Sequence, residues 1–190
     1  MDKEIITLPD IRLRQKSETI LEINDEIKAI IGKMKQAALD WEMGRPHELA
    51  TALAAVQIGI LKRIIIIRED FNDQENKNFI ALINPEIVKT SGRKESDYEG
   101  CLSVPDYYGL VPRAPKIKIK AKDEDGHTIF IKAEGFLART IQHEIDHTLG
   151  VPFIDRIKND KDAFFKLEAN GNLKDIDYDQ EIKSSRILWN

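Results

Sequence analysis

The residues of this chain best suited to chemistry are two histidines four positions apart, with a glutamate directly after the first. They are His143, Glu144 and His147, in the pattern H-E-x-x-H. On a helix, positions i and i+4 lie on one face, so both imidazoles can reach one metal ion. Glu144 would then lie beside the ion, where a carboxylate can act as a base on bound water. The spacing predicts a metal-dependent hydrolase.

A catalytic metal site of this kind usually has three protein ligands and an open position. The chain offers two further histidines, His47 and His127, and one cysteine, Cys101. His47 lies in a polar loop and His127 follows a predicted turn, so we expect both to be exposed. Cys101 follows a glycine and precedes Pro105, which favours a non-helical backbone. A lone cysteine is usually a small buried hydrophobe, but beside an incomplete H-E-x-x-H site thiolate ligation explains it better. A Cys/His/His set suits Fe(II) or Zn(II).

Three segments, in this order along the chain, resemble the peptide deformylase family. The first is L-A-A-V-Q-I-G over residues 53–59, the second E-G-C-L-S over 99–103, and the third Q-H-E-I-D-H over 142–147. The resemblance extends from about residue 4 to about residue 157. Members of the family remove the formyl group from the N-terminal formyl-methionine of new polypeptides.

The resemblance implies a role for each residue of the site. One divalent metal ion would be held by Cys101, His143 and His147; it is usually Fe(II), and Zn, Ni or Co can substitute. Glu144 would be the proton shuttle, because it can accept a proton from water and deliver it to the leaving amine. The side chain of Gln57 and the backbone N–H of Leu102 would stabilise the oxyanion, since neutral donors can do so without becoming charged.

Three neighbouring residues have less specific expectations. The family pairs residues like Glu99 and Arg113 as an ion pair near the substrate groove. Asp146 points away from the face that carries His143 and His147, so we expect it to support the ligands or to lie on the helix surface.

The chain departs from the family pattern at two places. Ala50 and Ala52 stand where the family has glycine. If φ is negative at both positions, the added methyl groups only narrow the substrate groove. If φ is positive at either position, the loop is strained by about 1 kcal/mol or more. Tyr107 and Tyr108 occupy a place where many members carry an arginine that contacts the peptide, so we expect a different preference beyond methionine.

Two other functions stay open at this stage. An H-E-x-x-H peptidase would cut internal peptide bonds, but it would use a downstream His or Glu as third ligand. A non-enzymatic descendant would keep the metal for structure, and Ala50 and Ala52 favour it. It would have no need of Glu144, and a closed structural zinc site wants a fourth protein ligand.

Composition narrows the class of protein. The chain has 190 residues, 42% of them hydrophobic and 33% charged, which fits one globular domain. A net charge of −4 gives no global basic field for a specific nucleic acid. The single cysteine excludes an internal disulfide. The N-terminus shows no secretory signal. The longest apolar run, Ile64–Ile67, is too short to span a membrane. We therefore expect a cytoplasmic protein, and the resemblance to the peptide deformylases implies an enzyme with an N-formylmethionyl peptide as substrate.

Hydrophobic periodicity predicts an α+β fold, with mostly antiparallel sheet around a central helix. We expect helices over 24–43 and 135–149, the second carrying the motif. Strands are expected over 61–68, 79–83, 86–90, 116–122 and 127–133, the last two as a hairpin around Asp125-Gly126. Residues 1–157 would form the metallohydrolase domain and 158–190 a polar C-terminal extension, with a short helix at 163–167. In the family such extensions can influence a transient contact with the ribosome, but this tail is not basic enough to predict it.

Overall fold

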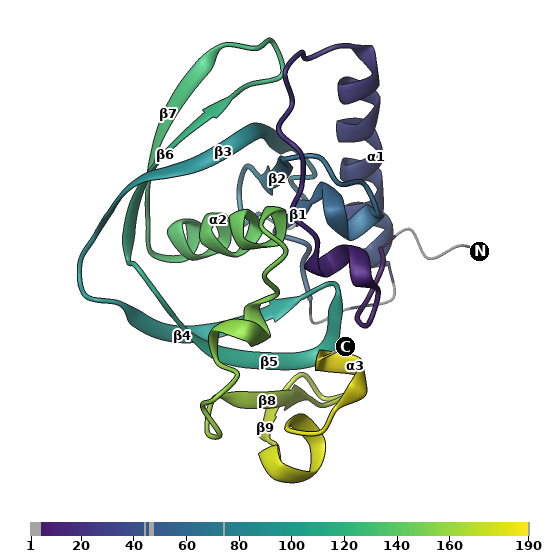
Figure 1. Cartoon of the computed structure of the whole chain (residues 1–190), viewed down its shortest axis with the longest axis vertical. Coiled ribbons are helices and arrows are strands. Elements are labelled where there is room, and N and C mark those ends of the chain that lie inside the picture. Colours follow the sequence, from purple (N-terminus) through teal and green to yellow (C-terminus); the bar gives the residue numbers. More distant parts are fainter. Residues whose placement is uncertain (1–4, 44, 46–47, 74, 190) are drawn as a thin grey trace.

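A computed structural model describes residues 5–43, 45, 48–73 and 75–189. The described residues form two antiparallel sheets, with a long helix packed on the outside and a second helix between the sheets (Figure 1). The first sheet has the strand order β1-β2-β3-β6-β7 and the second has the order β4-β5-β8-β9. This arrangement confirms the predicted α+β class. No helix in the described part of the chain is both long and apolar enough to cross a membrane.

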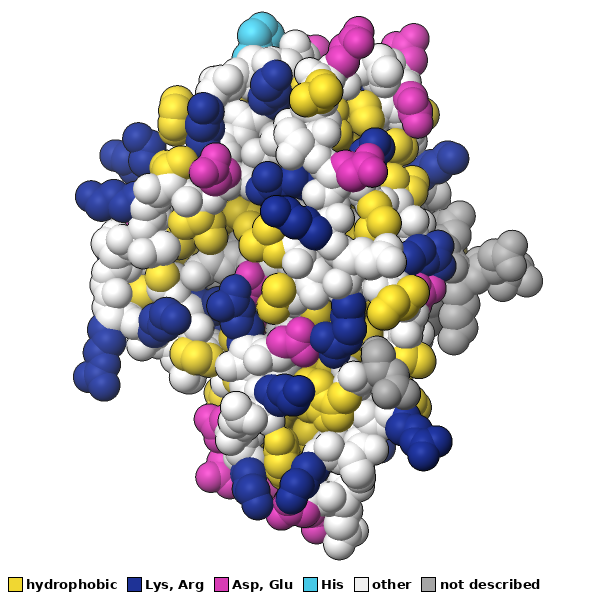
Figure 2. Space-filling view, viewed as in Figure 1, with side chains coloured by type: hydrophobic (Ala, Val, Ile, Leu, Met, Phe, Trp, Pro, Cys, Tyr) yellow, Lys and Arg dark blue, Asp and Glu magenta, His cyan; other side chains and the backbone are white. Residues whose placement is uncertain are grey.

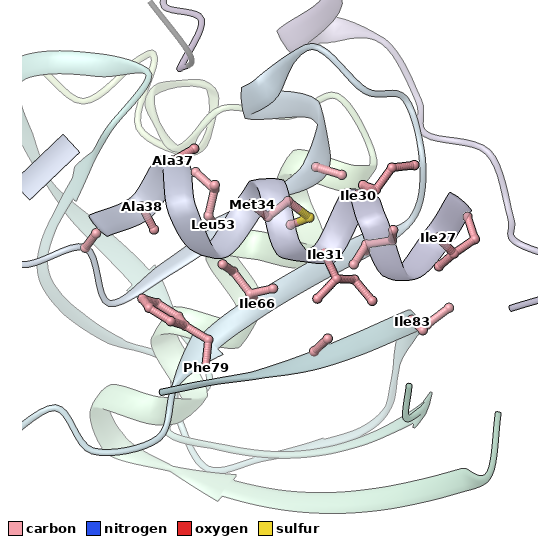
Figure 3. Close-up of a cluster of buried hydrophobic side chains, with 14 of the residues drawn as sticks. Ile27, Ile30, Ile31, Met34, Ala37, Ala38, Leu53, Ile66, Phe79 and Ile83 are labelled. Carbon is pink, nitrogen blue, oxygen red and sulfur yellow. The ribbon is translucent and has the colours of Figure 1, made fainter. Parts of the chain in front are cut away.

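Helix α1 (Asp25–Glu42) begins and packs as its sequence predicts. The side chain of Asn24 caps it by accepting a hydrogen bond from the Ile27 N–H over 3.2 Å. Its apolar stripe lies on β2 (Ile64–Arg68) and β3 (Phe79–Ser91), as Figure 3 shows; the buried members are Ile27, Ile30, Ile31, Met34, Ala37 and Ala38. This packing fixes one face of the sheet that carries the short strand β1 (Ala52–Ala54).

Strand β2 is buried on both faces. Ile64 and Ile66 belong to the apolar cluster under α1, and Ile65 and Ile67 to the cluster under the second helix. A continuous run of isoleucine therefore marks the central strand of a layered domain. The predicted strand over 61–68 begins three residues later than expected, at Ile64.

The two strands predicted over 79–83 and 86–90 are one strand, β3, so that prediction was wrong. Its pairing with β6 (Lys116–Lys122) shifts register between Ile83 and Glu86. Asn84 adopts φ +52° at this irregularity, and its side chain bonds the backbone of Ile20 through both amide atoms (2.9 and 2.7 Å). A β-bulge accommodates Asn84-Pro85, where the sequence pattern had indicated a break between two strands.

The predicted hairpin is present, with β7 at Thr128–Glu134. Strand β6 alternates strictly: Ile117, Ile119 and Ala121 face the core, while lysines face outward at the other positions. Helix α2 (Gly135–Thr148) follows β7 directly and lies against this core. Gly150 ends the turn after the helix at φ +74°, and a Cβ there would lie 2.6 Å from the Arg14 carbonyl oxygen.

The second sheet contains the segment that precedes and follows Cys101. Strands β4 (Glu95–Cys101) and β5 (Val104–Arg113) pair along their lengths and reverse direction at Leu102-Ser103. The short 3₁₀ segments η1 (Ile11–Arg14), η2 (Ala55–Ile58) and η3 (Phe153–Arg156) connect the main elements.

The prediction of a short helix over 163–167 was wrong. The segment is strand β8 (Phe164–Leu167), which pairs with β5 and with β9 (Leu173–Asp175). The free edge of β5 offers backbone hydrogen bonds that a short helix would forgo. After these strands come a π-helical turn, η4 (Tyr178–Ile182), and a short helix, α3 (Arg186–Trp189).

The extension is only partly solvated, because Phe164, Ile182 and Leu188 are buried in the cluster behind β5. The division into a domain over 1–157 and an extension over 158–190 stays a prediction.

Candidate metal centre and active site

The three predicted metal ligands meet at one point. One ligand atom from each of Cys101, His143 and His147 lies within 4.8 Å of the other two, and all three residues are buried. The sulfur of Cys101 lies 3.1 Å from Nε2 of His147. Helix α2 brings the histidines together through their i, i+4 spacing, with ring centroids 4.9 Å apart.

Cys101 is placed by the end of β4. A Cβ on Gly100 would lie 2.6 Å from the Tyr108 ring, so only glycine lets β5 pack this closely beside the cysteine. The sheet thus fixes the thiol, and the helix fixes the two imidazoles. Two rigid elements hold the set, as the sequence predicts.

Glu99 orients His143 from behind. Its carboxylate accepts a hydrogen bond from Nδ1 of His143 over 2.9 Å, which leaves Nε2 free to face the thiol. Arg113 donates to both oxygens of Glu99, over 2.8 and 3.0 Å, so the expected ion pair is present and buried. Burial opposes the charge on Glu99, but the bonds from Arg113 and His143 outweigh it and lower its pKa to about 2.

Sequence reasoning missed Arg139. Its Nη1 donates to Glu99 over 2.8 Å and to the Val111 carbonyl over 2.6 Å, and its Nη2 donates to the Glu95 carbonyl over 2.8 Å. Arg139 therefore joins α2 to β4 and β5 and completes the charge balance of Glu99. Its spacing, four residues before His143, places it on the ligand face of the helix, but its partners on β4 and β5 cannot be predicted from that spacing.

Asp146 is buried rather than on the surface. It accepts hydrogen bonds from Arg113 and from Arg156. It supports the ligands indirectly, which is one of the two expected outcomes. Gln142 holds the opposite side of the helix by bonding both backbone groups of Ala114, over 3.2 and 2.9 Å.

Glu144 is buried, and its Oε2 has no hydrogen-bond partner among the described residues. Burial raises the pKa of Glu144 to about 7, against the opposing effect of His143. A buried carboxyl beside the ligand set, with a free oxygen and a pKa near neutrality, can take up and release a proton.

The two histidines differ electrostatically. Burial lowers the pKa of His147, which favours the neutral ring that a metal ligand needs. Burial acts in the same direction on His143, but hydrogen bonds with Cys101 and Glu99 outweigh it and raise its pKa. As a metal ligand, His143 would bind through a deprotonated ring nitrogen, so metal binding would depend on pH.

The residues fit a metal ion. The sulfur of Cys101 and one ring nitrogen of each histidine lie within 4.8 Å of one another, and Nε2 of His147 faces the sulfur. Thiolate and imidazole donors suit a borderline divalent ion. The three ligands, together with the residues that hydrogen-bond to them, are arranged as in a catalytic site that leaves one coordination position open.

Gln57 lies at the predicted place. Its Oε1 accepts a hydrogen bond from the Ala54 N–H over 2.8 Å, so its amide N–H₂ is directed to the centre. Nε2 lies 3.2 Å from the Ser103 hydroxyl and 3.6 Å from the Cys101 sulfur. Leu102 lines the same cavity, and no acceptor for its backbone N–H is found among the described residues.

Ala50 and Ala52 are not strained. Neither is among the described non-glycine residues with positive φ, which are Asn84 and Asp106. Both side chains are buried in the apolar clusters on either side of the sheet. The outcome is therefore the milder of the two considered: alanine fills core space and costs no left-handed backbone.

A cavity of about 290 Å³ opens beside the ligand set, between β1, β4 and α2. Tyr108 forms part of its wall and donates a hydrogen bond to Glu48 over 3.2 Å. Burial and the Glu48 charge raise the pKa of Tyr108 to about 12, so it stays a donor. Of the two other histidines, His127 is exposed as predicted, and His47 lies outside the described residues.

Comparison with known proteins gives consistent matches. The family model described as polypeptide deformylase matches residues 2–163. A peptide deformylase of Brachyspira hyodysenteriae is 42% identical over 161 residues, covering 84% of this chain and 82% of that protein. One of Thermomicrobium roseum is 41% identical over 160 residues, covering 83% of this chain and 86% of that protein. The crystal structure of the Synechococcus elongatus enzyme with actinonin superposes with a TM-score of 0.74 at 38% identity, covering 82% of this chain and 80% of that one.

Proposed function

Because this chain belongs to the polypeptide deformylase family, we propose that Cys101, His143 and His147 hold its metal ion and that Glu144 moves the protons. The activity of the family is metal-dependent removal of the N-formyl group from newly made polypeptides. The observation that carries the assignment is the convergence of the three ligand atoms within 4.8 Å, beside a carboxylate with a free oxygen.

The donor set suits a borderline divalent ion such as Fe(II) or Zn(II). Membership of the family implies Fe(II) as the ion held in the cell, with Zn(II), Ni(II) or Co(II) able to substitute. When bound, the ion supplies a lowered pKa for water and polarisation of the formyl carbonyl. Every other step falls to side chains and backbone of the chain itself.

Glu144 accepts the proton of the attacking water and later delivers it to the leaving amine. A pKa of about 7 suits both transfers near neutral pH. The amine must leave as a neutral group, because an amide anion is a very poor leaving group. The free Oε2 of Glu144 supports this role.

Gln57 and the N–H of Leu102 stabilise the oxyanion that develops on the formyl oxygen. The hydrogen bond from Ala54 fixes the amide of Gln57 before the substrate binds, so its donor needs no reorganisation. Donors of this kind contribute about 10²- to 10³-fold in turnover.

The two alternative functions lose support. A peptidase of the H-E-x-x-H type would use a downstream His or Glu, whereas Cys101 lies upstream in the cluster found among the described residues. A non-enzymatic descendant was favoured by Ala50 and Ala52, and neither alanine is among the described residues with positive φ. A structural site would also leave the buried, unpartnered Glu144 unexplained.

A test of the reaction is incubation of the anaerobically prepared, Fe(II)-loaded protein with formyl-Met-Ala-Ser. We expect one formate and one free amine for each peptide consumed, with the Met-Ala and Ala-Ser bonds intact. Cleavage within the peptide would favour the peptidase, and absence of turnover with metal still bound would favour the non-enzymatic alternative.

We also propose a transient contact with the ribosome, and with it a cytoplasmic location. Support comes from the outer face of the first sheet, where Lys89, Lys118 and Lys132 lie opposite one another on β3, β6 and β7. Figure 2 shows Lys and Arg side chains along the left edge of the molecule, the side on which β6 and β7 lie in Figure 1. Like charges placed directly opposite destabilise a sheet, and an RNA backbone would relieve them. Sedimentation with ribosomes that weakens steeply with salt, and is lost in Lys118→Glu, would test the contact.

A further inference from the structure

Two half-exposed aromatic rings stand at the mouth of the cavity. Tyr98, on the edge strand β4, is 45% exposed, and Phe136, in the first turn of α2, is 52% exposed. Each ring is held from behind by a second ring in an edge-to-face arrangement: Tyr98 by Phe165 and Phe136 by Phe71, with centroids 5.0 and 5.1 Å apart. Rings that are braced in this way and open toward a cavity are suited to contact a ligand.

The brace behind Tyr98 comes from outside the part of the chain that matches the family. The family model ends at residue 163, and Phe165 lies in β8. Strand β8 pairs with β5, so that Phe165 is opposite Tyr108, which itself is opposite Gly100 on β4. The register therefore places Tyr98, Tyr108 and Phe165 on one face of the sheet.

The size of the cavity decides which part of a substrate meets these rings. About 290 Å³ lies at the lower end of the range for small-ligand pockets and has room for the formyl-methionine end of a peptide. The residues that follow must pass the mouth, where Tyr98 and Phe136 stand. Of the charged residues that line the cavity, Glu99 pairs with Arg139 and Glu48 pairs with Arg45, while Glu144 lies beside the metal ligands. The mouth thus presents aromatic ring surface, rather than an unpaired charge, to the side chain of the substrate residue that follows methionine.

We propose that Phe165 is a positioning residue of the C-terminal extension: it holds Tyr98 as one wall of a subsite for the side chain of the second substrate residue. This subsite takes an aliphatic or aromatic side chain in preference to a charged one. The inference rests on the proposed deformylase function and assigns part of its specificity to residues 164–167. Phe165 touches no reacting group; it acts through Tyr98.

The test compares two substrates that differ only at the second residue. Formyl-Met-Leu-Ser offers a side chain to the subsite and formyl-Met-Gly-Ser offers none. In Phe165→Ala we expect KM for the leucine peptide to rise roughly two- to tenfold, the size of one aromatic pair, with kcat unchanged. KM for the glycine peptide should stay as in the wild type. Tyr98→Ala should likewise raise KM for the leucine peptide, and the double variant should add little, because the two residues form one unit.

Two further variants separate positioning from general damage. Phe165→Tyr keeps the ring and should restore the wild-type KM. Phe130→Ala removes an aromatic side chain on β7 that is about as exposed as Tyr98 and does not line the cavity, so it should change KM for neither peptide. An equal rise in KM for both peptides, a fall in kcat, or no change in either would overturn the inference. Absence of turnover of both peptides by the wild type would instead contradict the proposed function itself.

Discussion

Nδ1 of His143 lies 2.9 Å from the carboxylate of Glu99, and this contact links the metal centre to the charge network of the fold. The same carboxylate is held by Arg113 and Arg139. A buried acid between two guanidinium groups keeps its charge and its position, so it fixes the orientation of the imidazole. The geometry of the site is thus fixed by residues that contact the metal ligands and are not ligands themselves.

Replacing Glu99 by Gln should weaken the site and the fold together. We expect metal affinity to fall about 10- to 100-fold, because the imidazole loses its orienting partner. Stability should fall by about 3 kcal/mol, because buried Arg139 loses its carboxylate partner and buried Arg113 keeps only Asp146. Competitive metal titration and urea unfolding measure the two effects. Glu134→Gln, which removes an exposed pairing with Lys116, is the matched control and should cost less than about 1 kcal/mol. Equal behaviour of the two variants would contradict this account.

Gly100→Ala should displace the thiol ligand. The new methyl group would lie 2.6 Å from the Tyr108 ring, which is held by its bond to Glu48, so the strand rather than the ring must move. We expect weaker metal binding and lower stability. Gly32→Ala is the control, since a Cβ there meets nothing within 4 Å, and in the middle of α1 it should stabilise the protein by about 0.5–1 kcal/mol. Metal affinity unchanged in Gly100→Ala would show that the close packing is not needed.

Restoring the family glycines should not help catalysis. Ala50→Gly and Ala52→Gly each remove a buried methyl group and add backbone freedom, so each should destabilise the protein by about 1 kcal/mol or more. We expect kcat/KM for formyl-Met-Ala-Ser not to rise in either variant. A clear gain in activity would mean that the alanines obstruct the groove.

Metal removal should lower stability without unfolding the chain. A bound ion stabilises the folded state by mass action. The three apolar clusters that stabilise the fold contain few of the residues that form the site, so they remain when the ion is removed. Chelation should therefore lower the unfolding temperature of the wild type and leave Cys101→Ser nearly unaffected, because serine lacks the thiolate. The same response in both proteins would rule out ligation by Cys101.

The ligand set could be predicted from the sequence because its signal is local. His143, Glu144 and His147 lie within one helical turn and a half, and Cys101 lies in its own short motif. The helix around His143 was also predictable, because its apolar period and flanking glycines are local features.

Features that depend on distant pairing were not predictable. Arg139 reads as a surface residue until β4 and β5 lie beside it, and the carbonyls of Glu95 and Val111 become its partners. The strand β8 was mistaken for a helix because only the open edge of β5 decides its conformation. Likewise, the sign of φ at Ala52 is set by the pairing of β1 with β2.

The central claim is that Glu144 moves protons at a metal centre held by other residues, and Glu144→Gln tests it most directly. Turnover of formyl-Met-Ala-Ser and metal content are measured on the same Fe(II)-loaded preparations of wild type and variant. We expect one metal ion per chain and an unchanged fold in both proteins, with turnover in the variant reduced by about 10²-fold or more. Turnover near that of the wild type, with metal bound, would remove Glu144 from the mechanism and contradict the account.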